Sequence, residues 1–383
     1  MSFSNKLFAF IFFTFLSLSV FCQQKQLDFN GDVTDVRVVR SVEQHPDAST
    51  LAIPHIAEWK PKHLVIAYEA GIPGKLDMAD IISIVSSNDG DTWGNPVYIF
   101  NHREKYGMQQ YAYANPILFK PPGQNILWCF AMRNPLSQPN SEESFLVGAY
   151  SGDGGRSWNQ VELTMHYTGS LVLTGNIQRI VENGEPVYLL PAHRNSLDNG
   201  PVGGARVHFV LRSKSLLDWD VAGYVPNPEK VWVHEGHIAL GKQDGELIMV
   251  MRTADNTNKA LTPPRAWSTL SVDNGRNWSI PKEEPELYNS VSEAGFGRSS
   301  DGLFYYIYND GPAWSRMALR YKVKSLDGQW SNERTFFDAN IHNSYPSLIE
   351  ISPNDFRAVW DSGSKEKGRQ KICFGKFRIL FGK

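Results

Sequence analysis

One eight-residue pattern recurs along the chain and constrains its fold more than any other feature. Three stretches follow the order Ser-x-Asp/Asn-x-Gly-x-polar-Trp, at residues 86–93, 151–158 and 271–278. A short unit that repeats at a regular interval cannot bury its apolar side chains alone, so it must stack on its neighbours. The repeat therefore predicts an architecture of stacked, similar units.

Each copy of the pattern is typical of a tight turn between two strands. The Asp or Asn side chain can accept hydrogen bonds from backbone amides just ahead of it, and the Gly permits a positive φ at the bend. The Trp can then return to the sheet and cover its apolar layer. Strand-like runs precede the first two copies, at residues 80–85 and 145–150. We expect the pattern to be structural rather than catalytic.

Two degenerate copies extend the repeat. Residues 213–219 keep the Ser, an acid and the Trp but lack the Gly, and residues 325–330 keep Ser, Asp, Gly and Trp in a shorter turn. The five copies begin at residues 86, 151, 213, 271 and 325, and these intervals suit a four-stranded propeller blade with its loops. We predict an all-β, six-bladed β-propeller whose sixth blade joins the N-terminal strand to the C-terminal strands. Seven thinner blades are the alternative.

The composition fits this fold and excludes some functions. The net charge of −2 gives no basic surface of the kind that binds nucleic acid. Aromatic residues make up 12% of the chain, which suits stacked sheets and also sugar binding. No apolar stretch with helical periodicity has useful length, so helices should be short or absent. The even spacing of the copies favours one catalytic propeller domain over residues 23–383, and we expect a monomer.

The first residues predict export. Lys6 precedes an apolar run over residues 7–20, which is too short for a comfortable membrane span and is typical of a secretory signal peptide covering residues 1–22. Cleavage after Cys22 would leave a secreted or periplasmic protein, and a lipoprotein acylated at Cys22 is the alternative. The mature chain then contains only Cys129 and Cys373, both in apolar strand-like segments, so we expect free buried thiols.

The segments between the copies resemble those of the sialidase (neuraminidase) superfamily over nearly the whole mature chain. Residues 232–252 resemble the stretch that holds a catalytic Glu and, after an Asp-Gly turn, a carboxylate-binding Arg; the match implies Glu235 and Arg252. Residues 308–319, followed by the last degenerate copy, resemble the stretch that supplies a further arginine and imply Arg316.

The same resemblance implies the remaining catalytic groups. Tyr345, in Tyr-Pro-Ser-Leu, matches the segment of the nucleophilic tyrosine. Residues 77–81 resemble the segment of the acid/base aspartate and imply Asp77, whereas Asp80 beside it is expected to be structural. His193 ends a Leu-Pro-Ala-His stretch, where the family often places a tyrosine of the pocket. Because a propeller gathers its inner strands around one axis, we expect these side chains to meet at one mouth.

The chain departs from the family at one position. Sialidases carry their first arginine in an Arg-Ile-Pro stretch, and here Ala52 stands at the arginine position. A charge-assisted hydrogen bond to a carboxylate contributes about 1.5–3 kcal/mol, so its loss argues against sialic acid as the substrate. We interpret histidines as the replacement, with His193 catalytic and three others in substrate binding: His55, His234 and His237. Their spacing makes no convincing metal site, and we expect no cofactor.

Arginines at the centre of the mouth indicate a sugar with a carboxylate. We favour β-elimination from a uronic acid in an acidic oligo- or polysaccharide such as ulvan, by a lyase or a dehydratase. There the arginines neutralise the carboxylate, a His or Tyr removes the C5 proton, and an acid protonates the departing C4 oxygen. The alternative is sialidase-like hydrolysis through Tyr345 and Glu235, with Asp77 as the acid. A third interpretation is a non-catalytic propeller that binds glycans.

Overall fold

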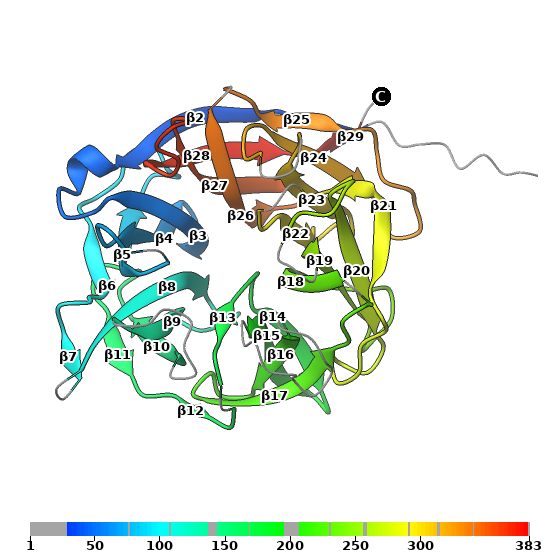
Figure 1. Cartoon of the computed structure of the whole chain (residues 1–383), viewed down its shortest axis with the longest axis horizontal. Helices are drawn as coiled ribbons and strands as arrows, with labels where there is room; N and C mark the ends of the chain where they lie inside the picture. The colour runs from blue at the N-terminus through cyan, green and yellow to red at the C-terminus, as the bar shows by residue number, and fades with distance from the viewer. Residues whose placement is uncertain are drawn as a thin grey trace, which may run out of the picture.

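Strands arranged around a central axis account for nearly all regular structure in the computed structural model (Figure 1). The structure describes residues 29–75, 77–106, 109–136, 144–167, 169–194, 207–229, 231–255, 259–289, 292–311, 315–339 and 341–381. The predicted signal peptide and Cys22 lie outside these residues. The helical structure within them is one 3-10 turn, η1 (Val42–Gln44), so the all-β prediction is confirmed.

The described strands group into six antiparallel units, each listed from the axis outward. The first contains β3 (Thr50–Lys60), β4 (His63–Gly71), β5 (Ala79–Ser86) and β6 (Val97–Phe100). The second contains β8 (Gln109–Phe119), β9 (Leu127–Pro135), β10 (Phe145–Ser151) and β11 (Asn159–Val161). The third has a divided inner strand, β13 (Val172–Leu173) and β14 (Gln178–Glu182), followed by β15 (Glu185–Arg194), β16 (Val207–Ser213) and β17 (Asp218–Val225).

The remaining units repeat this order. The fourth contains β18 (Val231–Leu240), β19 (Leu247–Asp255), β20 (Arg265–Ser271) and β21 (Lys282–Tyr288). The fifth contains β22 (Gly295–Arg298), β23 (Phe304–Asn309), β24 (Leu319–Lys324) and β25 (Arg334–Phe337). The sixth contains β26 (His342–Ser352), β27 (Asp355–Gly363), β28 (Lys371–Arg378) and β2 (Val33–Ser41). Four two-residue strands complete the set: β1 (Phe29–Asn30), β7 (Lys105–Tyr106), β12 (Thr164–Met165) and β29 (Leu380–Phe381).

The two ends of the chain close the ring together. Strand β2 pairs antiparallel with β28 and forms the outer edge of the sixth unit, beside the C-terminal strands (Figure 1). The N-terminal strand therefore completes the last blade, as the sequence predicted. A propeller closed in this way leaves short sheet edges at its rim and no long edge free to pair with another chain.

The repeated pattern forms the turn between the third and fourth strands of a blade. In the second unit, Asp153 Oδ1 accepts the backbone N–H groups of Arg156 and Ser157 at 3.1 and 3.0 Å. The Ser151 hydroxyl donates to Asp153 at 2.7 Å and accepts the N–H of Gly155, which has a φ of 87°. These contacts confirm the structural role predicted for the pattern.

Each well-formed turn also packs on the preceding blade. A Cβ on Gly155 would lie 2.9 Å from Val65 of the first unit, and the indole of Trp158 donates to the Ser83 hydroxyl at 2.9 Å. In the first unit, the ring of Trp93 meets Phe374 of the sixth unit edge-on at 5.5 Å. The turns therefore join the blades to one another.

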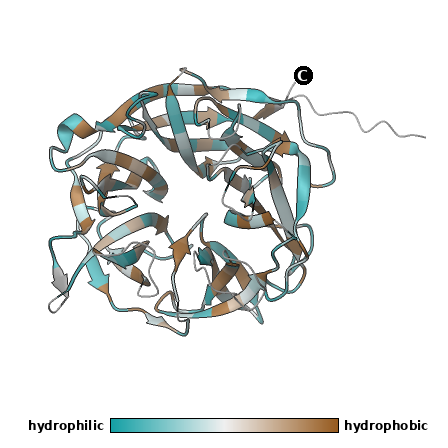
Figure 2. Ribbon diagram, viewed as in Figure 1, coloured by the Kyte–Doolittle hydropathy of each residue, from teal (hydrophilic) through white to brown (hydrophobic). Residues whose placement is uncertain are grey.

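Six apolar clusters fill the spaces between neighbouring blades and provide the core. Figure 2 shows hydrophobic colouring concentrated on the strands and hydrophilic colouring along the outer loops. Cys129 lies in the cluster between the first and second units, and Cys373 in the cluster between the fifth and sixth. Both are buried and free, as predicted.

Candidate active site

The innermost strands share an irregularity that points side chains at the axis. In β3, β8, β18 and β26 the ladder to the next strand shifts register at one point. The residues at these shifts all have a positive φ: Ile53 (46°), Asn115 (53°), Glu235 (48°) and Tyr345 (50°). A Pro or Gly follows each of them, and Pro fits a bulge because it gives no amide to the ladder. A positive φ is costly for such residues and clusters at functional sites.

A cavity of about 620 Å³ lies among these bulges, and all four bulge residues line it. Seven of the nine side chains that the sequence analysis assigned to the site also line it. They are Asp77, His193, His234, Glu235, Arg252, Arg316 and Tyr345. The propeller therefore brings together residues from its first, third, fourth, fifth and sixth units at one place, as the repeat predicted.

Glu235, Arg252 and Tyr345 form the centre of the cavity. Arg252 Nη1 lies 2.8 Å from each carboxylate oxygen of Glu235. The Tyr345 hydroxyl donates to Glu235 Oε1 at 3.4 Å. Burial opposes the charged form of Arg252, but the carboxylate of Glu235 outweighs it, so the pKa of Arg252 is raised. A carboxylate beside a tyrosine hydroxyl is the arrangement expected of a base next to its nucleophile.

Two more arginines face the ring of Tyr345. The guanidinium carbon of Arg316 lies 5.3 Å from the ring centroid, and that of Arg369 lies 4.7 Å from it. Burial and the charge of Glu235 raise the pKa of Tyr345, while these two arginines and Arg252 oppose that shift. The phenol is therefore protonated near neutral pH and needs a base to become a nucleophile.

Arg369 corrects one sequence interpretation. Histidines were taken to replace the arginine missing at Ala52, but the loop between β27 and β28 supplies an arginine to the same cavity. The N–H of Leu51 donates to the carbonyl of Arg369 at 3.2 Å, so this loop lies directly beside the vacant position. Asp361, fully buried, holds the guanidinium of Arg369 at 3.8 Å. No motif marks Arg369 because it belongs to a different blade from the one that usually carries this charge.

Glu69 is a second cavity residue that the sequence analysis missed. It lies opposite Ala52 in the ladder between β3 and β4, is 4% exposed, and accepts the N–H of Asn115 at 2.7 Å. Burial raises its pKa to about 7, against the opposing effects of the Asn115 amide and Arg369. The available signal was a single acid in the otherwise apolar strand β4, since a buried carboxylate is rare without a function or a partner.

Asp77 lies at the rim. It is exposed, has a φ of 50°, and lines the cavity from the loop between β4 and β5. Asp80 instead accepts both the backbone N–H and the ring nitrogen of His102, at 2.6 and 2.7 Å. Asp80 therefore has the structural role expected of it, and Asp77 is the carboxylate available to a ligand.

His193 and His234 line the third- and fourth-unit side of the cavity. Their rings meet edge-on, with centroids 5.6 Å apart. A third ring, His208, lies 6.4 Å from His193 and accepts the N–H of Gly236 through Nε2. Burial lowers the pKa of His208 to about 3, so His208 is a neutral, structural acceptor.

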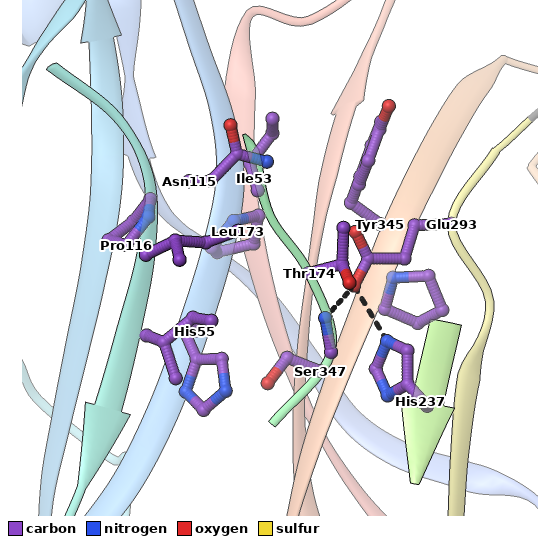
Figure 3. Close-up of a pocket in the computed structure, with 14 residues that line it drawn as sticks. Ile53, His55, Asn115, Pro116, Leu173, Thr174, His237, Glu293, Tyr345 and Ser347 are labelled. Carbon is purple, nitrogen blue, oxygen red and sulfur yellow. Dashed lines mark hydrogen bonds and ion pairs between the residues drawn. The ribbon is translucent and has the colours of Figure 1, made fainter. Parts of the chain in front are cut away.

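The expectation that His55 and His237 share the mouth with the other side chains is wrong. They line a separate, smaller pocket deeper along the axis, which we call the throat (Figure 3). His237 Nε2 lies 2.6 Å from Glu293 Oε1. His55 Nδ1 accepts the N–H of Leu118 at 3.3 Å, and burial, followed by His237, lowers the pKa of His55 to about 3.

The strand geometry explains this difference. His55 follows the bulge residue Ile53 by two positions, and His237 follows Glu235 by two. Two residues of a strand span about 6–7 Å, which carries the later side chain from the mouth into the throat. Figure 3 shows Ile53 and Tyr345 pointing to one end of the view and the two histidines lying toward the other.

Residues 62–358 match the family model described as BNR repeat-like domain. The chain belongs to this family. None of the curated proteins matches it. Among solved structures, a protein of unknown function from Dyadobacter fermentans is 17% identical, with a TM-score of 0.67 over 91% of this chain and 99% of its own.

Sialidases share the fold. The Hadza microbial sialidase is 17% identical, with a TM-score of 0.69 over 89% of this chain and 68% of its own. The leech intramolecular trans-sialidase, complexed with 2,7-anhydro-Neu5Ac, is 13% identical, with a TM-score of 0.65 over 90% of this chain and 70% of its own. The sialidase-like propeller of this BNR repeat-like protein is thus confirmed.

Two further observations bound the site. Within the described residues, no three His, Cys, Asp or Glu side chains are grouped so as to hold a metal ion. No helix in the same part of the chain is long and apolar enough to cross a membrane.

Proposed function

We propose that the protein is a glycoside-acting enzyme that cleaves a carboxylate-bearing sugar through a covalent intermediate on Tyr345. The observation that carries the proposal is the 3.4 Å contact of Tyr345 with Glu235 inside a cavity that three arginines also line. The sialidases among the structures with this fold support sialic acid, or a related sugar acid, as the class of substrate.

The residues divide the reaction between them. Arg252, Arg316 and Arg369 bind the carboxylate. Glu235 accepts the phenolic proton as Tyr345 Oη bonds to the anomeric carbon, and the bond from that carbon to the leaving oxygen breaks. Asp77 donates a proton to the leaving oxygen. In the second step Asp77 takes a proton from water, the water oxygen replaces Tyr345 on the anomeric carbon, and Tyr345 recovers its proton from Glu235.

Two observations favour this reaction over elimination from a uronate. Arg369 adds a third guanidinium near the nucleophile, which removes the main argument against a sialic acid-like substrate. Two of the four histidines proposed as bases, His55 and His237, line the throat instead of the cavity.

Elimination stands as a second candidate because His193 and His234 line the cavity. On a uronate-bearing glycan such as ulvan, one of them would remove the C5 proton while an acid protonates the departing C4 oxygen, leaving a double bond between C4 and C5. Both substrate classes lie outside the cytoplasm in most settings, which agrees with the export that the N-terminal apolar run predicts.

One experiment separates these reactions. The protein is incubated with sialyllactose and with uronate oligosaccharides, while free sugar acid and ultraviolet absorbance are followed. We expect release of the sugar acid, a covalent adduct on Tyr345 with a fluorinated substrate analogue, and a loss of kcat of about a thousandfold or more in Tyr345→Phe. Absorbance gained only on uronates would favour elimination, and binding without turnover would indicate a glycan-binding propeller.

A further inference from the structure

Residues outside the proposed reaction hold the Glu235 bulge in place. His208 Nε2 accepts the N–H of Gly236 at 3.1 Å, and the Thr174 hydroxyl donates to the carbonyl of Gly236 at 3.2 Å. Gly236 has no room for a side chain, since a Cβ there would lie 2.7 Å from the sulfur of Met249. The peptide next to Glu235 is therefore confined to one position.

Below this peptide, a buried ion pair crosses the throat (Figure 3). Glu293 Oε1 lies 2.6 Å from His237 Nε2 and accepts the N–H of Gly175 at 2.8 Å. The side chains of His237 and Glu293 are 9% and 11% exposed. Gly175 belongs to the third unit and His237 to the fourth, and Glu293 precedes the first strand of the fifth. One carboxylate thus joins three blades.

The same segment is connected to the nucleophile. Ser292, next to Glu293 in the chain, accepts the backbone N–H of Tyr345 through its hydroxyl at 3.4 Å. At the other end of the ion pair, His237 follows Glu235 by two residues. A continuous series of contacts therefore runs beneath the cavity from the base to the nucleophile.

We propose that His237 and Glu293 are positioning residues that set the separation between the Glu235 carboxylate and the Tyr345 hydroxyl. The inference rests on the function proposed above. Both side chains line the throat and not the cavity, so they act through the two bulges and not on the sugar. A displacement of reacting groups by about 1 Å can lower a rate on the order of a hundredfold. Breaking the pair should therefore lower kcat and leave the binding of the carboxylate by the arginines in place.

The test compares Glu293→Gln, His237→Ala and the double variant with the full-length wild-type protein. We expect kcat to fall about ten- to a hundredfold in each single variant, KM to change less than about threefold, and the double variant to be no slower than the slower single one. Glu182→Gln is the matched control. Glu182 is 10% exposed and pairs with Arg212 and Arg276, away from both pockets, so this variant should lose stability and keep its kcat.

The outcomes separate the two proposals. If the wild type neither turns over a sugar acid nor forms the adduct on Tyr345, the proposed function fails. If the wild type is active and the throat variants keep its kcat, or if their effects on kcat multiply in the double variant, the positioning role is refuted. Thermal unfolding of every variant checks that the compared proteins are folded.

Discussion

Replacing Glu69 with Gln should stabilise the protein at alkaline pH and have little effect at acidic pH. Glu69 is 4% exposed, and burial raises the pKa of its carboxyl from 4.5 to about 7. Below pH 4.5 both the native and the unfolded protein keep the proton. Between pH 4.5 and 7 the native protein keeps it and the unfolded chain loses it, so the free energy of unfolding falls as the pH rises.

The size of the effect follows from this window. Each pH unit lowers the free energy of unfolding by about 1.4 kcal/mol, so the ionised carboxylate costs about 3 kcal/mol above pH 7. A neutral Gln avoids this cost and keeps an oxygen that can accept the N–H of Asn115. The variant should therefore exceed the wild type in stability by up to about 3 kcal/mol at pH 8.5 and match it at pH 4.

Urea unfolding of both proteins at pH 4, 6 and 8.5 measures the difference. The reasoning is refuted if Glu69→Gln gains the same stability at all three pH values. It is also refuted if the variant is less stable than the wild type at pH 8.5, since that would mean that Arg369 and Asn115 hold an ionised Glu69 at a net gain.

Two further changes test other parts of the molecule. Arg369→Ala should lower kcat/KM for a carboxylate-bearing substrate about ten- to a hundredfold, because one charge-assisted pair contributes about 1.5–3 kcal/mol. An uncharged aryl glycoside is the control, and an equal loss on it would show that Arg369 does not read the carboxylate. Asp153→Ala removes the acceptor of the repeated turn and should lower the free energy of unfolding by about 1–3 kcal/mol in urea, with unchanged kcat per folded molecule. A variant as stable as the wild type would contradict the structural role of that turn.

Local chemistry made the ring and much of the cavity predictable. The turn around Asp153 depends on side chains within a few residues of one another, so its sequence is enough to recognise it. Glu235 and Tyr345 were found because each lies in a recognisable segment of its own blade. Arg369 was missed because what decides its position is a contact with Leu51, more than three hundred residues earlier in the chain. His55 was misplaced because a sequence gives the strand of a residue more readily than its depth along the axis.

The bulges imply how proteins built on this ring can diverge. Ile53 and Asn115 occupy the same kind of kink as Glu235 and Tyr345 and face the same cavity. A substitution at either position would present a new group to the ligand without moving the reacting pair. Changes of substrate could then accumulate blade by blade, each at a single codon, while the turnover chemistry stays on the fourth and sixth blades.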